Sequence, residues 1–102
     1  MAVVYITEYA RQGRDAAGYQ MVVADEPPIL NQTVAITVGS LQSAAFNALT
    51  KFVRVSTDAV CSIEFGSSPT ASATTRRMPA NSTEYFSVPL AVGFKIAVIT
   101  NT

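Results

Sequence analysis

The feature that most constrains the fold is a series of short apolar runs in the second half of the chain, each bounded by turn-forming residues. The runs cover residues 51–57, 59–66, 83–88 and 94–100. In the second run Cys61, Ile63 and Phe65 alternate with the polar residues Ser62 and Glu64, which is the two-residue period of a strand with one buried face. This spacing predicts an all-β fold, an antiparallel β-sandwich or jelly roll, with a closed barrel as the alternative.

The remaining segments extend this pattern. Residues 33–39 predict another strand that ends at Gly39, and the last run is apolar on both phases except at Lys95, which predicts an interior strand. Residues 40–50 leave a helical turn, a loop and an edge strand open, while residues 56–58, 66–75 and 78–82 predict turns or surface loops. The positions predicted to be buried are Val34, Ile36, Val53, Val55, Cys61, Ile63, Phe65, Phe86, Val88, Ile96 and Val98.

The first thirty residues differ from the rest of the chain. Residues 2–9 are strand-like, residues 10–18 predict an exposed loop, and residues 19–24 form another apolar run that Pro27 and Pro28 close. We therefore predict one domain with an extended N-terminal arm or hairpin over residues 1–30 and a sandwich core over residues 31–102. Such an arm is either held by a neighbouring subunit or forms an edge hairpin on its own domain.

Composition limits the classes of partner. Charged residues make up 14% of the 102-residue chain, against about 25% in typical soluble domains, which predicts that a partner covers some apolar surface. With 7 basic and 7 acidic residues the net charge is zero, which argues against nucleic acid as a partner. No apolar stretch reaches the roughly 20 residues that cross a bilayer, and no secretory signal is visible at the N-terminus, so we expect no membrane partner and synthesis in the cytoplasm.

The residues offer little catalytic chemistry. The chain has no histidine, and its single cysteine, Cys61, falls on the apolar phase of a strand and predicts a small buried hydrophobe. The spacing of Asp58, Glu64 and Glu84 brings no two carboxylates onto one face. We therefore expect no enzyme, no catalytic residue, no cofactor and no metal site.

Arginines and tyrosines are the candidates for contacts with other molecules. The pair Arg76 and Arg77 is either an ordinary exposed pair, a contact with an acidic subunit surface or a phosphate contact. Tyrosines anchor surfaces because they bury a ring and keep a hydroxyl at its edge, with a sugar-binding platform as the alternative. The candidate contacts with neighbouring subunits are Tyr5, Tyr9, Arg11, Arg14, Tyr19, Arg76 and Arg77.

Several stretches together resemble a known group of proteins. They are residues 4–10, 42–47 and 52–58, the pair Phe65 and Gly66 before residues 69–71, and the turn at residues 77–81. In these stretches the chain resembles small head accessory proteins encoded in tailed bacteriophages and prophages. The resemblance spans most of the chain, contains no catalytic motif and transfers no site residue.

The resemblance implies a non-enzymatic virion structural protein. Its expected role is that of a capsid decoration, or cement, protein on the capsid surface, which binds the major capsid protein and copies of itself, with a trimer favoured over a dimer, and bridges neighbouring capsomers. A head-to-tail adaptor, tail or fibre-associated component is the alternative, and a carbohydrate-binding β-sandwich is a second alternative.

Overall fold

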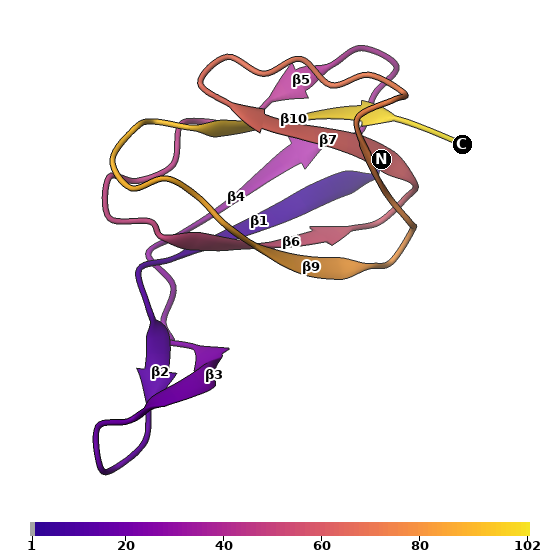
Figure 1. Cartoon of the computed structure of the whole chain (residues 1–102). Coiled ribbons are helices and arrows are strands. Elements are labelled where there is room, and N and C mark those ends of the chain that lie inside the picture. The colour runs from indigo at the N-terminus through magenta and orange to yellow at the C-terminus, as the bar shows by residue number, and fades with distance from the viewer. Residues whose placement is uncertain (1) are drawn as a thin grey trace.

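The computed structural model describes residues 2–102, which form ten strands and no helix (Figure 1). Two four-stranded sheets lie face to face, and a two-stranded hairpin projects from one end of the pair. All strand pairs are antiparallel. The predicted antiparallel β-sandwich with an N-terminal hairpin is therefore confirmed.

The first sheet has the order β4-β1-β6-β9. Its strands are β1 (Val3–Tyr9), β4 (Leu30–Ala35), β6 (Phe52–Thr57) and β9 (Thr83–Ser87). Along β1 the side chains of Val4 and Ile6 are fully buried while Tyr5 between them is 47% exposed, because alternate residues of a strand point to opposite faces. This sheet therefore has one face in the core and one face in solvent.

The second sheet has the order β5-β10-β7-β8. Its strands are β5 (Leu41–Gln42), β7 (Cys61–Gly66), β8 (Arg76–Met78) and β10 (Lys95–Thr100). The three successive residues Ile96, Ala97 and Val98 of β10 are all fully buried. The predicted interior position of the last strand is confirmed.

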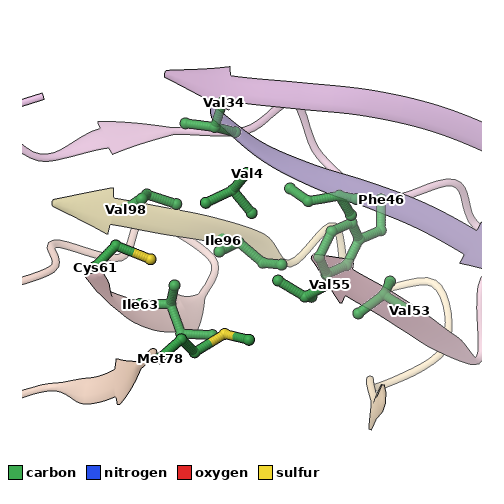
Figure 2. Packing of buried hydrophobic residues seen from close by; sticks show 11 residues of the cluster. Val4, Val34, Phe46, Val53, Val55, Cys61, Ile63, Met78, Ile96 and Val98 are labelled. Atoms are coloured by element: carbon green, nitrogen blue, oxygen red, sulfur yellow. The ribbon is translucent and has the colours of Figure 1, made fainter. Parts of the chain in front are cut away.

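The core lies between the two sheets (Figure 2). Seven of the eleven positions predicted to be buried are buried, and the other four, Ile36, Phe65, Phe86 and Val88, are partly buried against the same cluster. The prediction missed Val4, Ile6, Phe46 and Met78, which complete the cluster. Burial of Val4 and Ile6 already shows that the first strand belongs to the sandwich.

The domain boundary predicted at residue 30 is therefore wrong for β1. This strand pairs with β4 on one side and with β6 on the other, so residues 31–102 alone lack an interior strand of the first sheet. The projecting segment is shorter than predicted. It consists of β2 (Gln12–Arg14), β3 (Gln20–Ala24) and the turns that join them to β1 and β4.

Other strands also begin or end at residues that differ from the predicted ones. β4 ends at Ala35 and not at Gly39, and Val38 beyond it is 89% exposed. Residues 40–50 contain the short edge strand β5 followed by a loop, so the helical turn is excluded. Two short strands were missed, β2 in a predicted loop and β8 at the start of a predicted turn, because three residues are too few to show a period.

A buried carboxylate ties the loop after β5 to the first sheet. Glu8 on β1 is fully buried, and its Oε1 accepts hydrogen bonds from the Asn47 amide and the Thr50 hydroxyl, both at 2.8 Å. Its Oε2 accepts a hydrogen bond from Gln32 Nε2 at 3.0 Å. These donors satisfy a charge that would otherwise be costly to bury.

Candidate functional site

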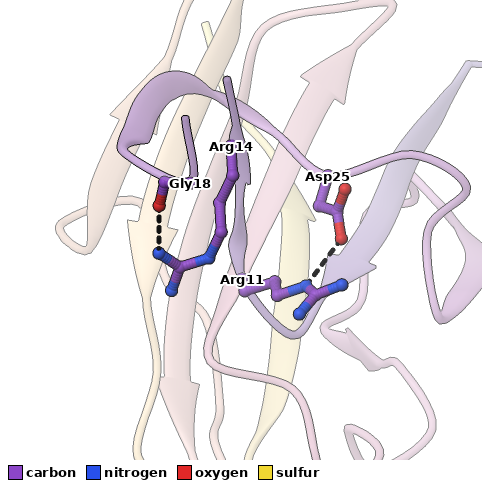
Figure 3. A network of polar contacts seen from close by, with 4 residues as sticks. All are labelled: Arg11, Arg14, Gly18 and Asp25. Carbon is purple, nitrogen blue, oxygen red and sulfur yellow. Dashed lines mark hydrogen bonds and ion pairs between the residues drawn. The ribbon is translucent and has the colours of Figure 1, made fainter. Parts of the chain in front are cut away.

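The projecting hairpin is the part of the molecule with the most unusual surface. At its tip Asp15 Oδ1 accepts hydrogen bonds from the amides of Ala17 and Tyr19, both at 2.9 Å. Gly18 adopts a φ of 88°, a conformation that glycine reaches without steric cost. The Arg14 guanidinium donates to the Gly18 carbonyl at 3.0 Å, which closes the turn (Figure 3).

The base of the hairpin is joined to the sandwich by polar and aromatic contacts. Arg11, just before β2, and Asp25, just after β3, form an ion pair of 2.7 Å (Figure 3). The Tyr9 hydroxyl donates to Glu26 at 2.7 Å, and the Tyr9 ring stacks on Phe52 with centroids 5.2 Å apart. Burial, followed by the hydrogen bond to Glu26, raises the pKa of Tyr9 to about 12. The hairpin is therefore anchored at its base.

Beyond this base the hairpin exposes apolar side chains. Tyr19 is 73% exposed, Val22 is 93% exposed and Val23 is 54% exposed, while Met21 is 42% exposed. The side chains of Met21, Val22 and Val23 follow one another along β3 (Gln20–Ala24), so the strand is uncovered over most of its length. A hairpin of two strands is marginally stable at best in water when it stands alone, so the contacts at its base are what hold it to the sandwich.

The same end of the sandwich carries further apolar residues. Leu49 precedes β6, and Leu90 and Val92 follow β9; all three are at least half exposed. The pairing of Tyr9 with Phe52, and of Phe52 with Ser87, brings these loops to the end from which the hairpin leaves. Exposed apolar residues that gather in one region mark interaction surfaces.

An open cleft of about 920 Å³ lies between the hairpin and the first sheet. Val22, Val23 and Glu26 line one side, and Phe52 and Tyr85 line the other. The Tyr85 ring is 58% exposed and lies 6.3 Å from Phe52. The cleft thus combines an exposed aromatic ring with charged and polar groups.

The structure gathers four of the seven candidate contact residues at this hairpin, namely Tyr9, Arg11, Arg14 and Tyr19. The other three lie on the sandwich. Tyr5 is half exposed on the solvent face of the first sheet, Arg76 lies over the Phe86 ring at 5.0 Å, and Arg77 donates to the Thr102 carbonyl at 3.2 Å. Both arginines of the pair therefore have contacts within the chain.

Sequence reasoning missed the most exposed residues of this surface, Val22 and its neighbours on β3. The apolar run at residues 19–24 was visible, but its exposure depends on the hairpin leaving the sandwich. Glu26 was not among the candidate contacts, and Tyr85 was considered only as one tyrosine of a possible sugar-binding platform. Neither an acidic pair before two prolines nor one tyrosine on a strand is a specific signal.

Within residues 2–102 no group of three His, Cys, Asp or Glu side chains is placed to hold a metal ion. Cys61 is fully buried, as predicted, and burial raises the pKa of its thiol. In the same part of the chain no helix is long and apolar enough to cross a membrane.

Comparison with known proteins gave no relative. No family model, no curated protein and no solved structure matched the chain.

Proposed function

We propose that this protein is a non-enzymatic virion structural protein that decorates the assembled head of a tailed bacteriophage and cements its capsomers. The hairpin carries the proposal. It is anchored at its base by Tyr9 and Glu26 and leaves Tyr19, Val22 and Val23 more than half exposed. A cement protein needs such an element, because it must reach a neighbouring subunit from a folded domain.

The energetics of the hairpin fit this role. Burial of apolar surface contributes about 25 cal/mol per Å² before the cost of association is subtracted. One short strand therefore gives weak binding on its own. On a symmetric shell the same contact repeats at many sites, and linked contacts raise the overall affinity without any new interaction.

Strand order adds support. If β4 is counted as the first of the eight sandwich strands and β1 as the last, the two sheets β4-β1-β6-β9 and β5-β10-β7-β8 read 1-8-3-6 and 2-7-4-5. This is the order of an eight-stranded jelly roll, an architecture of capsid proteins and lectins. The chain begins with the last strand of that cycle, so it starts one strand earlier than the numbering. Fold alone does not define function, so the argument depends on the hairpin.

The proposal is tested by adding purified protein to phage heads that lack it. In one variant residues 12–24 are replaced by an Asn-Gly turn, which fits because the Asp25 amide already donates to the Arg11 carbonyl at 3.2 Å. A matched pair of point variants is Val22→Lys on the hairpin and Val38→Lys on the sandwich, at 93% and 89% exposure.

We expect the hairpin-less protein and Val22→Lys to attach at least about tenfold more weakly than wild type, which corresponds to about 1.4 kcal/mol. Val38→Lys should attach like wild type. Wild-type attachment by the hairpin-less protein would contradict the proposal.

The cleft favours carbohydrate binding as a second candidate function. Tyr85 offers an exposed ring, and Arg11, Arg14, Gln20 and Glu26 line the space opposite it, a combination suited to stacking and hydrogen bonding with a sugar. Calorimetric titration with bacterial surface glycans tests this candidate. Binding that Tyr85→Ala abolishes would support it, and no binding to any glycan would reject it.

A further inference from the structure

The two sheets of the sandwich differ in what lies over their outer faces. The loop over residues 67–75 lies over the second sheet, where Gln42 Nε2 donates to the Pro69 carbonyl at 2.8 Å and Ser62 on β7 is fully buried. The outer face of the first sheet is open, since Tyr5 on its interior strand β1 is 47% exposed. This open face has a charged residue near its middle.

That residue is Arg54 on the interior strand β6. It lies opposite Thr7 on β1 and Tyr85 on β9, and Thr7 lies opposite Asn31 on β4. Side chains of directly opposed residues in antiparallel strands share one face of the sheet. The register therefore places these four side chains in one row across the outer face.

Arg54 has no counter-charge within the described chain. The single ion pair among residues 2–102 joins Arg11 to Asp25. Arg54 is nevertheless half-buried. A cation that is partly withdrawn from water attracts an anion more strongly than a fully exposed one, because the local dielectric constant is lower. Arg54 is therefore positioned to bind an anion from another molecule.

Neutral polar side chains surround this arginine. An open pocket of about 500 Å³ lies over this part of the sheet, within the range of about 300–1,000 Å³ typical of small-molecule sites. Ser56 bonds to Thr83 at 2.6 Å, whereas the hydroxyl groups of Thr7 and Thr33 make no hydrogen bond with another residue of the described chain. The pocket lining includes Tyr5, Thr7, Asn31, Thr33, Arg54 and Ser56.

We propose that this pocket binds an acidic saccharide, a chain of uronic acid residues, with the Arg54 guanidinium on a sugar carboxylate. The pocket shares no residue with the cleft beside Tyr85. The inference goes beyond the proposed function, because it concerns the face of the first sheet and not the hairpin.

The chemistry of the lining matches that of a uronic acid. The planar guanidinium of arginine binds a carboxylate through two parallel hydrogen bonds. Threonine hydroxyls and the asparagine amide both donate and accept hydrogen bonds, as the hydroxyl groups of a sugar do. The half-exposed ring of Tyr5 offers an apolar surface to the C–H groups of the sugar. A uronic acid carries all of these groups, whereas an aspartate or glutamate side chain supplies only the carboxylate.

Calorimetric titration of the purified full chain with galacturonic acid oligomers tests the inference. The methyl esters of the same oligomers keep the sugar hydroxyls and remove the charge. We expect wild type to bind the acid, and to bind the ester at least about tenfold more weakly. Arg54→Gln should bind the acid at least about tenfold more weakly than wild type. Arg54→Lys, which keeps the charge but loses the two parallel bonds, should fall between them.

Two controls separate the pocket from general electrostatics. Lys95→Gln removes one positive charge from a half-buried position on β10 of the second sheet and should bind like wild type. Glutamic acid oligomers of equal length supply carboxylates without sugar hydroxyls and should bind at least about tenfold more weakly than the saccharide. Equal affinity for the two oligomers would overturn the assignment to a saccharide.

Nuclear magnetic resonance of wild type locates the site without any variant. On addition of the galacturonic acid oligomer, the backbone amide signals of Thr7, Thr33 and Arg54 should shift, while those of Val22 and Val23 in the cleft stay in place. No binding, equal binding of the methyl ester, or shifts confined to the cleft would each overturn the inference. So would binding that Arg54→Gln, shown to be folded by circular dichroism, leaves intact. Attachment of hairpin variants to phage heads is a separate measurement, so either proposal can fail alone.

Discussion

β7 in the sandwich and β3 in the hairpin are both short strands rich in apolar residues, yet β7 is buried and β3 is exposed. β7 lies between β10 and β8, and its central Ile63 is fully buried. β3 has one neighbour, and its central Val22 is 93% exposed. An apolar strand becomes part of the core only where a second layer of structure covers it. Of these two strands, the chain covers β7 and leaves β3 exposed. Within the described chain β3 stays uncovered, and the proposed function assigns its cover to another molecule.

The largest contrast is expected from removal of whole segments. Deletion of residues 1–9 removes the interior strand β1, whose Val4 and Ile6 are fully buried, and should abolish cooperative unfolding. Replacement of residues 12–24 by an Asn-Gly turn should leave a folded sandwich with a melting temperature close to that of wild type. Thermal unfolding followed by circular dichroism measures both, and loss of folding in the second variant would show that the hairpin belongs to the core.

A smaller contrast comes from single truncations in the two strands. Ile63→Ala should destabilise the protein by about 2–5 kcal/mol, because a buried side chain leaves a cavity. Val22→Ala should change the free energy of unfolding of the monomer by no more than about 0.5 kcal/mol. Urea unfolding at the lowest practical protein concentration compares them, and equal effects would mean that Val22 is covered within the monomer.

Glu8 sharpens the comparison within the sandwich. Glu8→Ala removes the acceptor for three hydrogen bonds, including those of the Asn47 amide and the Thr50 hydroxyl. Buried donors without acceptors cost about 1–3 kcal/mol each, so we expect a loss on the order of 3 kcal/mol. Glu8→Gln, which keeps the shape and one acceptor oxygen, should lose less. A neutral effect of Glu8→Ala in urea unfolding would contradict the network.

The smallest expected effect is on the pH dependence of stability, through Tyr9 at the base of the hairpin. The pKa of Tyr9 is raised to about 12 in the folded protein, from 10.0, so its contribution to stability is complete below pH 10 and is lost as the pH rises toward 12. The carbon chemical shift of the Tyr9 ring against pH reports this pKa, and Tyr9→Phe should flatten the decline in stability. Titration of Tyr9 at its ordinary value would show that the contact with Glu26 is open in solution.

The alternation of apolar and polar residues along the sequence predicted the strands whose burial follows from that alternation. The alternation of Cys61, Ile63 and Phe65 was enough to identify β7 and its buried face. The burial of Glu8, by contrast, could not be predicted from the local sequence. An acid in a strand is expected to face water, and it is buried here because donors 24 to 42 positions away in the chain converge on it. No local period carries that information.

The same limit explains the candidate site. The apolar run of β3 was recognised, and Arg11, Arg14 and Tyr19 were correctly placed on one N-terminal element. The projection of that element depends on the contact between Tyr9 and Glu26 and on the pairing of β1 with β4 and β6. These are long-range contacts, so β1 was assigned to the arm and not to the sandwich.

Cryo-electron microscopy of phage particles that carry this protein tests the central claim most directly, namely that the hairpin joins the protein to neighbouring subunits on the shell. The account predicts density for the sandwich at many symmetry-related positions that bridge capsomers, with each hairpin in contact with a neighbouring subunit. Density only at the portal vertex or tail, or hairpins that project freely into solvent, would contradict it.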